Sequence, residues 1–401
     1  MRVTIGFAAL LATLGPVGAV LEIGRPFGDH MVLPMRRPVE IRGVSGAGAG
    51  VEVEFAGQRR ATVAGPGGRW RVELPALEPS SRPRVLRVSS GGETVVIEDV
   101  LVGEVWLCSG QSNMDFPLLR AVGGREEAAA AAECPEIRLF DLAGVPTPSR
   151  AWSGEERERV TTADYFRGGW KVASEPAAGG FSAVGWWAGK MIHRARGVPV
   201  GLVDNSVGGS GAEAWLPRER IEADPRYGEL RGPQWMVSRR VPAWARGRAR
   251  VNRGGRPGPH PYQPGFLFDA GVRWWRGFPL AGVLWYQGET NAELRDDAWN
   301  ERLIVDLVGG WREALGQPQL PFVMVQLPEI GGSDPLRAGW PQFREVQARA
   351  AARLRRVEVV VTRDLGWDSA DVHPPDKRPV GERLGRAALG VGPATPAPAH
   401  E

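Results

Sequence analysis

The chain has 401 residues, enough for one large hydrophobic core and a second, smaller one, because single domains commonly hold about 100–200 residues. Its 50 Lys and Arg residues and 46 Asp and Glu residues give a net charge of +4, and these charges are spread along the chain. The even spread excludes the basic patch by which proteins bind nucleic acid, so we expect no nucleic-acid partner. Sixteen Trp residues stand beside four Tyr residues, and an indole face can stack on a sugar ring as well as fill a core.

The first 19 residues have the pattern of a signal peptide. Met1 and Arg2 give a positive start, residues 5–14 form an apolar run, and residues 17–19 offer the small side chains of a cleavage site. The apolar run is too short for a membrane-spanning helix, which needs roughly 18 uninterrupted apolar residues. We therefore predict a signal peptide over residues 1–19, a secreted or periplasmic protein, and no membrane partner.

Residues 20–98 are predicted to form a small antiparallel β-sandwich domain. Short segments with alternating apolar and polar side chains are separated by breaks rich in Gly and Pro, which is typical of such modules. The alternating segments are residues 39–42, 51–55, 69–74, 85–88 and 94–97.

From residue 99 to residue 391 strands and helices alternate, which predicts a three-layer α/β/α domain with a central parallel sheet. The predicted strands are residues 100–107, 137–142, 200–205, 281–286, 321–327 and 357–362. The predicted helices are the segment after Ser182, which is a plausible N-cap, and residues 297–315, 343–355 and 378–389.

Two segments of the second half show neither a strand period nor a helix period. Residues 232–264 are rich in Arg, Gly and Pro, and we interpret them as a long loop near the site or a mobile insertion. Residues 392–401 contain three prolines and are predicted to form a disordered tail.

Ser112 stands in the stretch Val-Trp-Leu-Cys-Ser-Gly-Gln-Ser-Asn-Met, residues 105–114, directly after an apolar predicted strand. A nucleophile needs such an exposed turn, with backbone amides nearby to stabilise the oxyanion formed on attack. The stretch is not a G-x-S-x-G elbow, because Met114 stands where the last Gly would be. By itself a serine in a turn is weak evidence.

Three further polar clusters follow predicted strands of the same sheet: residues 208–211, residues 287–291 and residues 371–374. Loops that follow parallel strands share the carboxyl edge of the sheet, where open α/β sheets bind ligands. The sequence therefore predicts that Ser112 and the three clusters meet at one site.

Each cluster supplies a group that acyl transfer requires. His373 can take the proton of Ser112, since the imidazole pKa lies near neutrality, and a carboxylate can orient the ring. Gly209 offers a backbone amide, and Gln287 or Asn291 can add a side-chain donor to the oxyanion hole.

Together these stretches resemble the successive motifs of the sialate O-acetylesterase family, which is similar to the family-six carbohydrate esterases and belongs to the SGNH hydrolase superfamily. The matching stretches are residues 104–114, 208–215, 285–292 and 371–374, with flanking likeness at 28–33, 181–185 and 198–202. The likeness covers nearly the whole chain beyond the predicted signal peptide.

The resemblance implies an SGNH-type catalytic domain over residues 99–391 and a carboxylic ester hydrolase. The expected reaction removes O-acetyl groups from a carbohydrate, with 9-O-acetylated sialic acid as the expected substrate and with no metal or organic cofactor. The implied roles are Ser112 as nucleophile, His373 as base, and Gly209 with Gln287 or Asn291 at the oxyanion.

The resemblance leaves two candidates for the acid that orients His373. Superfamily members often carry an aspartate three residues before the histidine, a position held here by Ala370, whereas Asp371 lies two residues before it. In related carbohydrate esterases a glutamate at the position of Glu289 orients the histidine. We expect Asp371, with Glu289 as the alternative.

Two other functions stay open at this point. One is an acetylxylan or other polysaccharide acetylesterase with the same triad and a different pocket. The other is a non-catalytic carbohydrate-binding protein, against which the joint presence of Ser112, His373 and Asp371 argues. The sequence makes no prediction of oligomeric state.

Overall fold

The computed structural model describes residues 20–331 and 334–392 and divides the chain into two units. The predicted signal peptide lies outside the described residues, as do residues 393–401 of the predicted tail. The smaller unit holds the described residues up to Gly24, together with Glu40–Leu74 and Val85–Val96. The larger unit holds Arg25–Val39, Pro75–Arg84 and the described residues from Ile97 onward.

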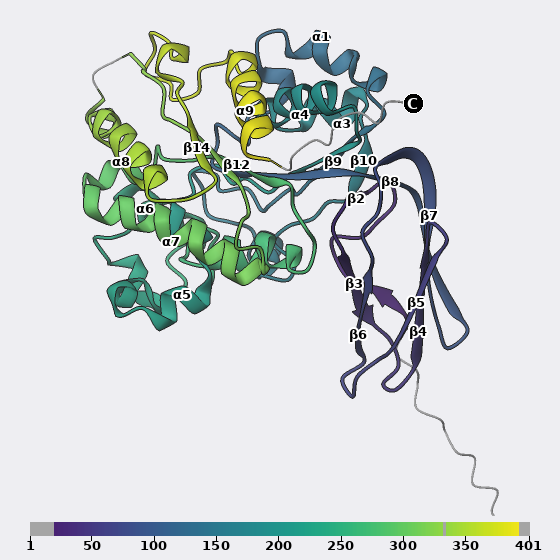
Figure 1. Ribbon diagram of the computed structural model, residues 1–401. Coiled ribbons are helices and arrows are strands. Elements are labelled where there is room, and N and C mark those ends of the chain that lie inside the picture. The colour runs from purple at the N-terminus through teal and green to yellow at the C-terminus, as the bar shows by residue number, and fades with distance from the viewer. Residues whose placement is uncertain (1–19, 332–333, 393–401) are drawn as a thin grey trace, which may run out of the picture. The chain divides into compact units, whose positions relative to one another are not determined.

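A row of parallel strands forms the centre of the larger unit (Figure 1). Its order is β9 (Ile137–Asp141), β11 (Val200–Asp204), β8 (Glu93–Gly110), β12 (Gly282–Tyr286), β13 (Phe322–Val325) and β14 (Val357–Val360). Strands β11, β12 and β13 are buried along their whole length, as expected of a parallel sheet covered on both faces. The predicted parallel strands are therefore confirmed.

Two short strands extend this row. Strand β10 (Trp170–Val172) runs antiparallel to β9 at one edge. Strand β2 (Val32–Pro34) pairs in parallel with residues 101–103 of β8. This second pairing explains why Arg25–Val39 belongs with the larger unit, whereas the sequence suggested one continuous module over residues 20–98.

The chain changes sides of the sheet at β8. After β8 it builds β9 and β11 on one side of that strand and then crosses to β12, β13 and β14 on the other. Such a reversal leaves a crevice beyond the carboxyl ends of the strands, and ligands bind there in open α/β sheets. The loops after β8, β11 and β12 therefore surround the expected position of a site.

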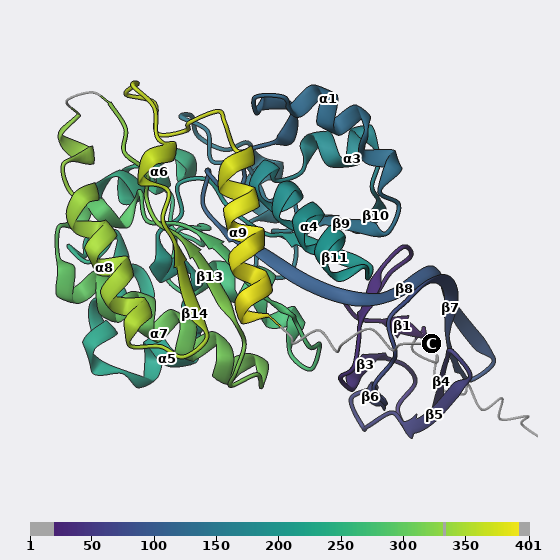
Figure 2. The same cartoon turned by 45° about the horizontal axis from the view of Figure 1, so that its top comes forward.

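Helices cover both faces of the sheet (Figures 1 and 2). One face carries α4 (Ala183–Arg196) and α9 (Arg378–Val391), and the other carries α7 (Asp297–Leu315) and α8 (Trp340–Ala352). The predicted N-cap is confirmed, because the Ser182 hydroxyl accepts from the amide of Gly185 at 2.9 Å. The α8 helix begins three residues before its predicted start at Phe343, with Pro341 in its first turn.

Helices α4 and α9 pack with their backbones close together. A Cβ at Gly385 of α9 would lie 2.8 Å from the Ala188 carbonyl oxygen of α4, and a Cβ at Gly381 would lie 2.7 Å from Cβ of Trp187. These two glycines stand four residues apart, so they lie on one face of α9. Because these two positions carry no side chain, the backbone of α4 can approach this face of α9 closely.

Shorter helices lie in the connections between these elements. They are α1 (Gly124–Ala129), α2 (Gly154–Arg159), α3 (Glu175–Gly180), α5 (Arg218–Ala223) and α6 (Ala243–Arg253).

The smaller unit consists of short strands, several of which alternate buried and exposed side chains. One sheet joins β1 (Glu22–Ile23), β3 (Val39–Val44) and β6 (Arg69–Leu74). Strand β4 (Gly50–Phe55) pairs with both β5 (Gln58–Val63) and β7 (Ser80–Ser90). The alternating segments of the sequence are therefore strands, and β5 is an additional strand that the pattern missed.

Residues 232–264 were expected to form a long loop near the site or a partly mobile insertion, and the segment does reach the cavity of Ser112, but it is not without helix. The segment contains α6, which begins after Pro242 and ends at Gly254 in the left-handed conformation. Ala245 and Ala249 lie on its buried side, and Ala and Arg have high helix propensity. The sequence did not predict this helix because its buried side chains are mostly alanines, which give a weak apolar pattern, and many of its other residues are arginines.

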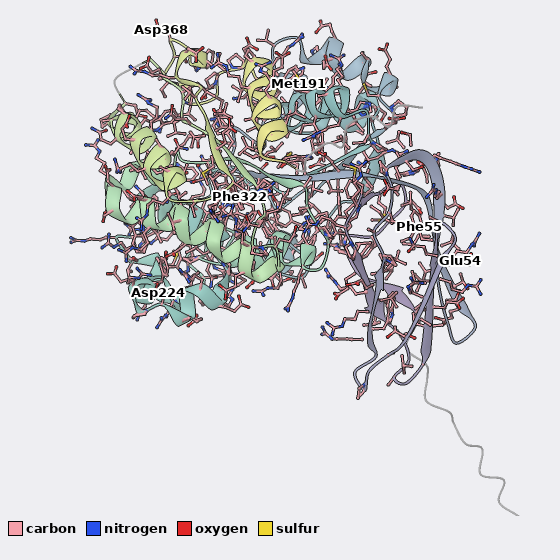
Figure 3. All side chains as sticks on the ribbon, in the orientation of Figure 1. Glu54, Phe55, Met191, Asp224, Phe322 and Asp368 are labelled. Atoms are coloured by element: carbon pink, nitrogen blue, oxygen red, sulfur yellow. The ribbon has the colours of Figure 1, made fainter. Side chains whose placement is uncertain are left out.

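The interior of the larger unit is filled with aromatic side chains. Phe322, the first residue of β13, is one of these buried aromatic residues (Figure 3). Six Trp side chains are among the largest fully buried ones: Trp106, Trp186, Trp215, Trp275, Trp311 and Trp340. Trp244 differs from them, because it is 38 % exposed.

Among the described residues, no helix is both long enough and apolar enough to span a bilayer.

Two adjacent glycines of α7 provide a test of this packing. A Cβ at Gly310 would lie 2.9 Å from the ring of Pro217, whereas a Cβ at exposed Gly309 would meet nothing within 4 Å. We expect Gly310→Ala to lower the free energy of unfolding by about 1–3 kcal/mol through overpacking. Gly309→Ala should raise it by up to about 1 kcal/mol, since alanine favours helix. Urea unfolding followed by circular dichroism measures both, and equal effects at the two positions would contradict the packing described.

Candidate active site

Ser112 stands just beyond the carboxyl end of β8, in a turn held by the neighbouring strand. The amide of Gln111 donates to the carbonyl of Tyr286, the last residue of β12, at 2.9 Å. Gly110 has a φ of 135°, and a Cβ there would lie 2.1 Å from the same carbonyl oxygen. Only glycine allows so close a passage, so Gly110 fixes Ser112 at the junction of β8 and β12.

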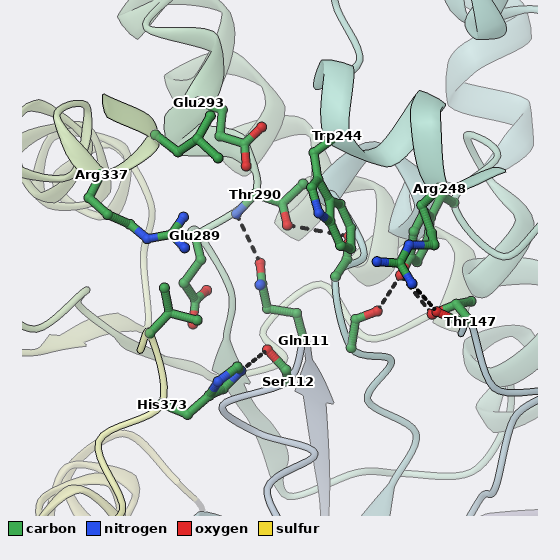
Figure 4. A pocket seen from close by; sticks show the side chains of 15 residues that line it. Gln111, Ser112, Thr147, Trp244, Arg248, Glu289, Thr290, Glu293, Arg337 and His373 are labelled. Atoms are coloured by element: carbon green, nitrogen blue, oxygen red, sulfur yellow. Dashed lines mark hydrogen bonds between the residues drawn. The ribbon is translucent and has the colours of Figure 1, made fainter. Parts of the chain in front are cut away.

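A chain of hydrogen bonds joins Ser112 to His373 and His373 to Asp371. Ser112 Oγ lies 2.8 Å from His373 Nε2 (Figure 4), and Asp371 Oδ1 lies 2.7 Å from His373 Nδ1. The same Oδ1 accepts from the backbone amide of His373 at 3.1 Å. Because the carboxylate can only accept, Nδ1 carries the proton and Nε2 is left to accept from the serine hydroxyl. This arrangement can remove the hydroxyl proton during nucleophilic attack.

The surroundings of His373 favour its neutral form. Burial lowers the pKa of His373 from its usual 6.5, the hydrogen bond and charge of Asp371 oppose this, and the positive charges of Lys377 and Arg120 add to the lowering. Burial raises the pKa of Asp371, but the hydrogen bonds from His373 outweigh it and leave that pKa below its usual value. At neutral pH the pair is therefore a neutral imidazole beside an ionised carboxylate.

Ser112 and His373 open into a cavity of about 350 Å³, which is in the range of small-molecule sites. It is lined by Gln111, Ser112, Thr147, Gly208, Gly209, Trp244, Arg248, Tyr262, Glu289, Thr290, Glu293, Leu336, Arg337, Val372 and His373. In the described part of the chain, no three His, Cys, Asp or Glu side chains are grouped so that they could hold a metal ion.

The turn of Gly208 and Gly209 after β11 forms one wall of this cavity. The Tyr262 hydroxyl donates to the Gly208 carbonyl at 2.6 Å, and the Thr290 hydroxyl donates to the Gly209 carbonyl at 3.3 Å. Gly209 has a φ of 74°, and a Cβ there would lie 2.4 Å from the Trp244 ring. The predicted position of Gly209 at the cavity therefore depends on glycine in two ways, through its backbone conformation and through the close approach of Trp244.

The Asp115 carboxylate supports this turn, because it accepts from the amide of Gly208. Desolvation and the nearby negative charge of Asp141 raise the pKa of Asp115 to about 7. The carbonyls and one amide of the turn are thus all engaged, which holds the turn in one conformation.

Gln287 and Asn291 differ from the expectation that one of them lines the site. Both are buried, with exposures of 2 % and 1 %, and neither reaches the cavity. The Gln287 amide donates to Asn291 Oδ1 at 2.6 Å and to Gln111 Oε1 at 3.2 Å, and Asn291 Nδ2 donates to Glu213 at 3.1 Å. Their amide groups are therefore committed to protein acceptors beneath the cavity, and neither is placed as an oxyanion donor.

Gln111 takes the place at the cavity that was expected for these amides. Its Oε1 accepts from the backbone amide of Thr290 at 3.3 Å and from Gln287 at 3.2 Å. Because a backbone amide can only donate, the carbonyl end of Gln111 faces Thr290 and the Nε2 end is turned away. Among the described residues this Nε2 has no hydrogen-bond partner, and Gln111 lines the cavity beside Ser112 (Figure 4).

Among the described residues Glu289 forms no hydrogen bond or ion pair with His373, and it accepts from Asn113 instead. The Asn113 amide donates to Glu289 Oε1 at 2.5 Å and to the Val372 carbonyl at 2.9 Å, while its Oδ1 accepts from Lys377 Nζ. Burial raises the pKa of Glu289 and lowers that of Lys377 to about 7. Asn113 therefore separates a buried acid from a buried base behind the His373 loop.

Comparisons with known proteins identify the family of the chain. A family model for "carbohydrate esterase, sialic acid-specific acetylesterase" matches residues 264–390. The crystal structure of a carbohydrate acetylesterase from Xanthomonas citri is 31% identical in sequence, with a TM-score of 0.74, over 93% of this chain and 75% of that one. The sialate O-acetylesterases of mouse and human are each 28% identical over 81% and 80% of this chain. The chain belongs to the sialate O-acetylesterase family.

This member of the sialate O-acetylesterase family, a family of carboxylic ester hydrolases, is short beside its mammalian relatives. It spans 64% of the length of the mouse protein and 61% of that of the human protein.

Several cavity residues of this family member were not found from the sequence. Trp244, Arg248 and Tyr262 come from the segment interpreted as a loop, and the signals of α6 were Pro242 before it and Gly254 after it. Gln111, which lines the cavity, and Asn113, which is fully buried behind it, flank Ser112 in its motif, and the sequence assigned neither of them a role.

The charges around His373 predict two opposite shifts of its pKa in this esterase-family chain. Asp371→Asn should lower the pKa of His373, because it removes the negative charge that stabilises the imidazolium. Lys377→Met should raise it, because it removes a positive charge. NMR titration of the His373 ring measures both shifts, and Asp376→Asn, at an exposed position of the same loop, should shift the pKa far less. Shifts of the same sign in the two variants would contradict this account.

Proposed function

We propose that this chain is a secreted serine carbohydrate O-acetylesterase, which hydrolyses acetyl esters through an acyl-enzyme. The observation that carries the proposal is the chain of hydrogen bonds from Ser112 Oγ to His373 Nε2 at 2.8 Å and from His373 Nδ1 to Asp371 at 2.7 Å. It stands at the edge of a sugar-sized cavity in a chain of the sialate O-acetylesterase family.

The proposed reaction has two steps. In the first, Ser112 Oγ attacks the acetyl carbonyl while His373 Nε2 takes the hydroxyl proton, and the sugar oxygen then leaves with that proton. In the second, water loses a proton to Nε2 and attacks the acetyl-serine, and the proton returns to Ser112 Oγ as acetate leaves. Asp371 holds the ring with Nε2 toward the serine and stabilises the imidazolium that forms in both steps.

Two donors are proposed for the oxyanion. One is the backbone amide of Gly209, as expected from the sequence, in a turn whose carbonyls are held by Tyr262 and Thr290. The other is Nε2 of Gln111, which replaces the earlier candidates Gln287 and Asn291. Donors fixed before the reaction stabilise the charge without reorganising as it develops, and Gln287 contributes by holding Gln111.

The proposed substrate is an O-acetylated carbohydrate, with the 9-O-acetyl group of sialic acid as the first candidate. The description of the matching family model and the names of the mammalian relatives support the sialic acid. A polysaccharide acetylesterase is the second candidate, because the relative from Xanthomonas citri is described only as a carbohydrate acetylesterase.

The proposal also includes an SGNH-type catalytic domain, a small β-sandwich domain and export from the cytoplasm. The strand order β11-β8-β12-β13-β14, with helices on both faces, supports an SGNH-type three-layer domain. The alternating strands of the smaller unit support a β-sandwich. Export rests on the signal-peptide pattern of residues 1–19.

Ser112→Ala is the first test of the proposed mechanism. We expect kcat/KM for p-nitrophenyl acetate to fall by at least about 10³-fold, because the other members of a triad do little without the nucleophile. The control is Ser81→Ala, at an exposed serine of β7, which should keep the wild-type rate. Retention of most activity by a folded Ser112→Ala protein would sink the serine mechanism.

A second test separates the two candidate acids. Asp371→Asn should lower kcat by about 10²–10⁴-fold, since the amide cannot accept the Nδ1 proton and stabilise the imidazolium. Glu289→Gln keeps an oxygen that can accept from Asn113, and should cost less than about tenfold by the net worth of such a bond. Matched initial rates on p-nitrophenyl acetate give the comparison, and a larger loss at Glu289 would overturn the assignment of Asp371.

A further inference from the structure

Helix α6 carries two side chains into the cavity, Trp244 and Arg248. The sequence analysis expected a loop near the site or an insertion here and assigned no residue of it to binding. We propose that these two residues form the subsite for the leaving sugar, in which the sugar ring packs on Trp244 and a carboxylate of the sugar binds Arg248. The inference rests on the proposed acetylesterase function, and it names the residues that select an acidic sugar.

The two side chains are placed together by the helix. They stand four residues apart, so they lie on the same face of α6, and the Arg248 guanidinium lies 5.3 Å from the centre of the Trp244 ring. In the close-up of the cavity both enter from the side opposite His373 and Arg337 (Figure 4). A sugar whose acetyl group is at Ser112 can therefore extend toward them.

Trp244 presents a fixed aromatic surface. Its ring approaches Gly209 closely enough that a Cβ there would collide with it at 2.4 Å, and its centre lies 5.8 Å from that of Tyr262. It is nevertheless 38 % exposed, unlike the buried Trp side chains of the core. An exposed indole held by its neighbours costs little conformational entropy on binding, so it suits the apolar face of a sugar ring.

Arg248 presents a positive charge that the protein leaves uncompensated. Its Nη1 donates to the carbonyl of Thr147 at 3.0 Å, and among the described residues no Asp or Glu forms an ion pair with it. Arg337, across the cavity, is different, because it pairs with Asp334 at 3.5 Å. A guanidinium fixed by one carbonyl keeps further N–H groups for a ligand, and its planar fork matches a carboxylate.

The difference between the two arginines decides which of them binds the anion. A carboxylate at Arg337 would have to compete with Asp334 and would lie near Glu289 and Glu293, which line the same side of the cavity. A carboxylate at Arg248 meets no such competitor. A neutral acetylated sugar would gain the contact with Trp244 but would leave Arg248 without an anionic partner, so the subsite favours acidic sugars.

The first experiment compares 9-O-acetylated sialic acid with its C1 carboxamide. The carboxamide lacks the negative charge of the carboxylate but has nearly the same size and shape. Wild-type protein should prefer the acid in kcat/KM for acetate release, and Arg248→Gln should reduce this preference by about 10–100-fold, the range of a charge-assisted hydrogen bond. Arg250→Gln, on the same helix but exposed and outside the cavity, should keep the wild-type preference. An unchanged preference in Arg248→Gln would overturn the role of Arg248.

The ring contact has its own variants. Trp244→Phe keeps a ring beside Gly209 and should raise KM for both sugars, while p-nitrophenyl acetate, which has no sugar, is affected far less. Trp244→Ala also removes the contact with the Gly209 turn, so kcat should fall on all three esters as well. Equal rises in KM on all three esters in a folded Trp244→Phe protein would overturn the stacking role.

A binding measurement keeps this inference separate from the proposed function. Calorimetric titration of the Ser112→Ala protein with free sialic acid needs no catalysis, and adding Arg248→Gln should weaken binding about 10-fold or more, whereas adding Arg250→Gln should not. If the binding depends on Arg248 but the wild-type protein has no esterase activity, the proposed function is refuted and the subsite stands. Esterase activity with no such dependence would refute the subsite alone.

Discussion

The hydrogen bonds of Asn113 hold the candidate site together. Ser112 and His373 are 261 residues apart in the chain, and the loops that carry them leave different strands. Asn113, beside the serine, binds the Val372 carbonyl next to the histidine, Glu289 of the β12 loop, and Lys377 at the entry to α9. One buried amide thus uses both of its ends to join three loops, while the second oxygen of Glu289, Oε2, has no hydrogen-bond partner among the described residues.

Glu289 and Lys377 can both be buried in this network because neither needs to carry a full charge there. A lone carboxylate or ammonium group would pay a large desolvation cost behind the cavity. Glu289 and Lys377 lie on either side of one amide, and burial shifts their pKa values in opposite directions, each toward the neutral form. Burial lowers the pKa of His373, Asp371 raises it, and Lys377 lowers it further, so the network also affects the basicity of the imidazole.

The sequence predicted those parts of the fold in which the pattern of apolar and polar side chains matches the pattern of burial. Continuous apolar runs marked β11 and β12, and a polar cluster after each strand marked the edge where Ser112 and His373 meet. Strand β5 escaped because its side chains are mostly exposed and show no alternation. Helix α6 escaped because alanines fill its buried side.

Amides of the site were harder to predict than its charged groups. The side-chain amides of Gln287 and Asn291 are chemically suited to donate to an oxyanion. In the fold, however, both amides bind protein acceptors, and Gln111 faces the cavity instead. The orientation of a side-chain amide depends on its hydrogen-bond partners, and these come from distant segments, as Thr290 does for Gln111. The local sequence around an amide therefore does not predict its orientation.

The contact between Gly209 and Trp244 restricts how this scaffold can diversify. A residue larger than glycine at position 209 collides with the indole, so a change there requires a smaller side chain at 244. Conversely, a chimera that receives α6 from a relative will place a new side chain against the turn that is proposed to hold the oxyanion. Exchanging the helix to alter sugar preference therefore also tests the catalytic turn, and the two segments are best redesigned as one unit.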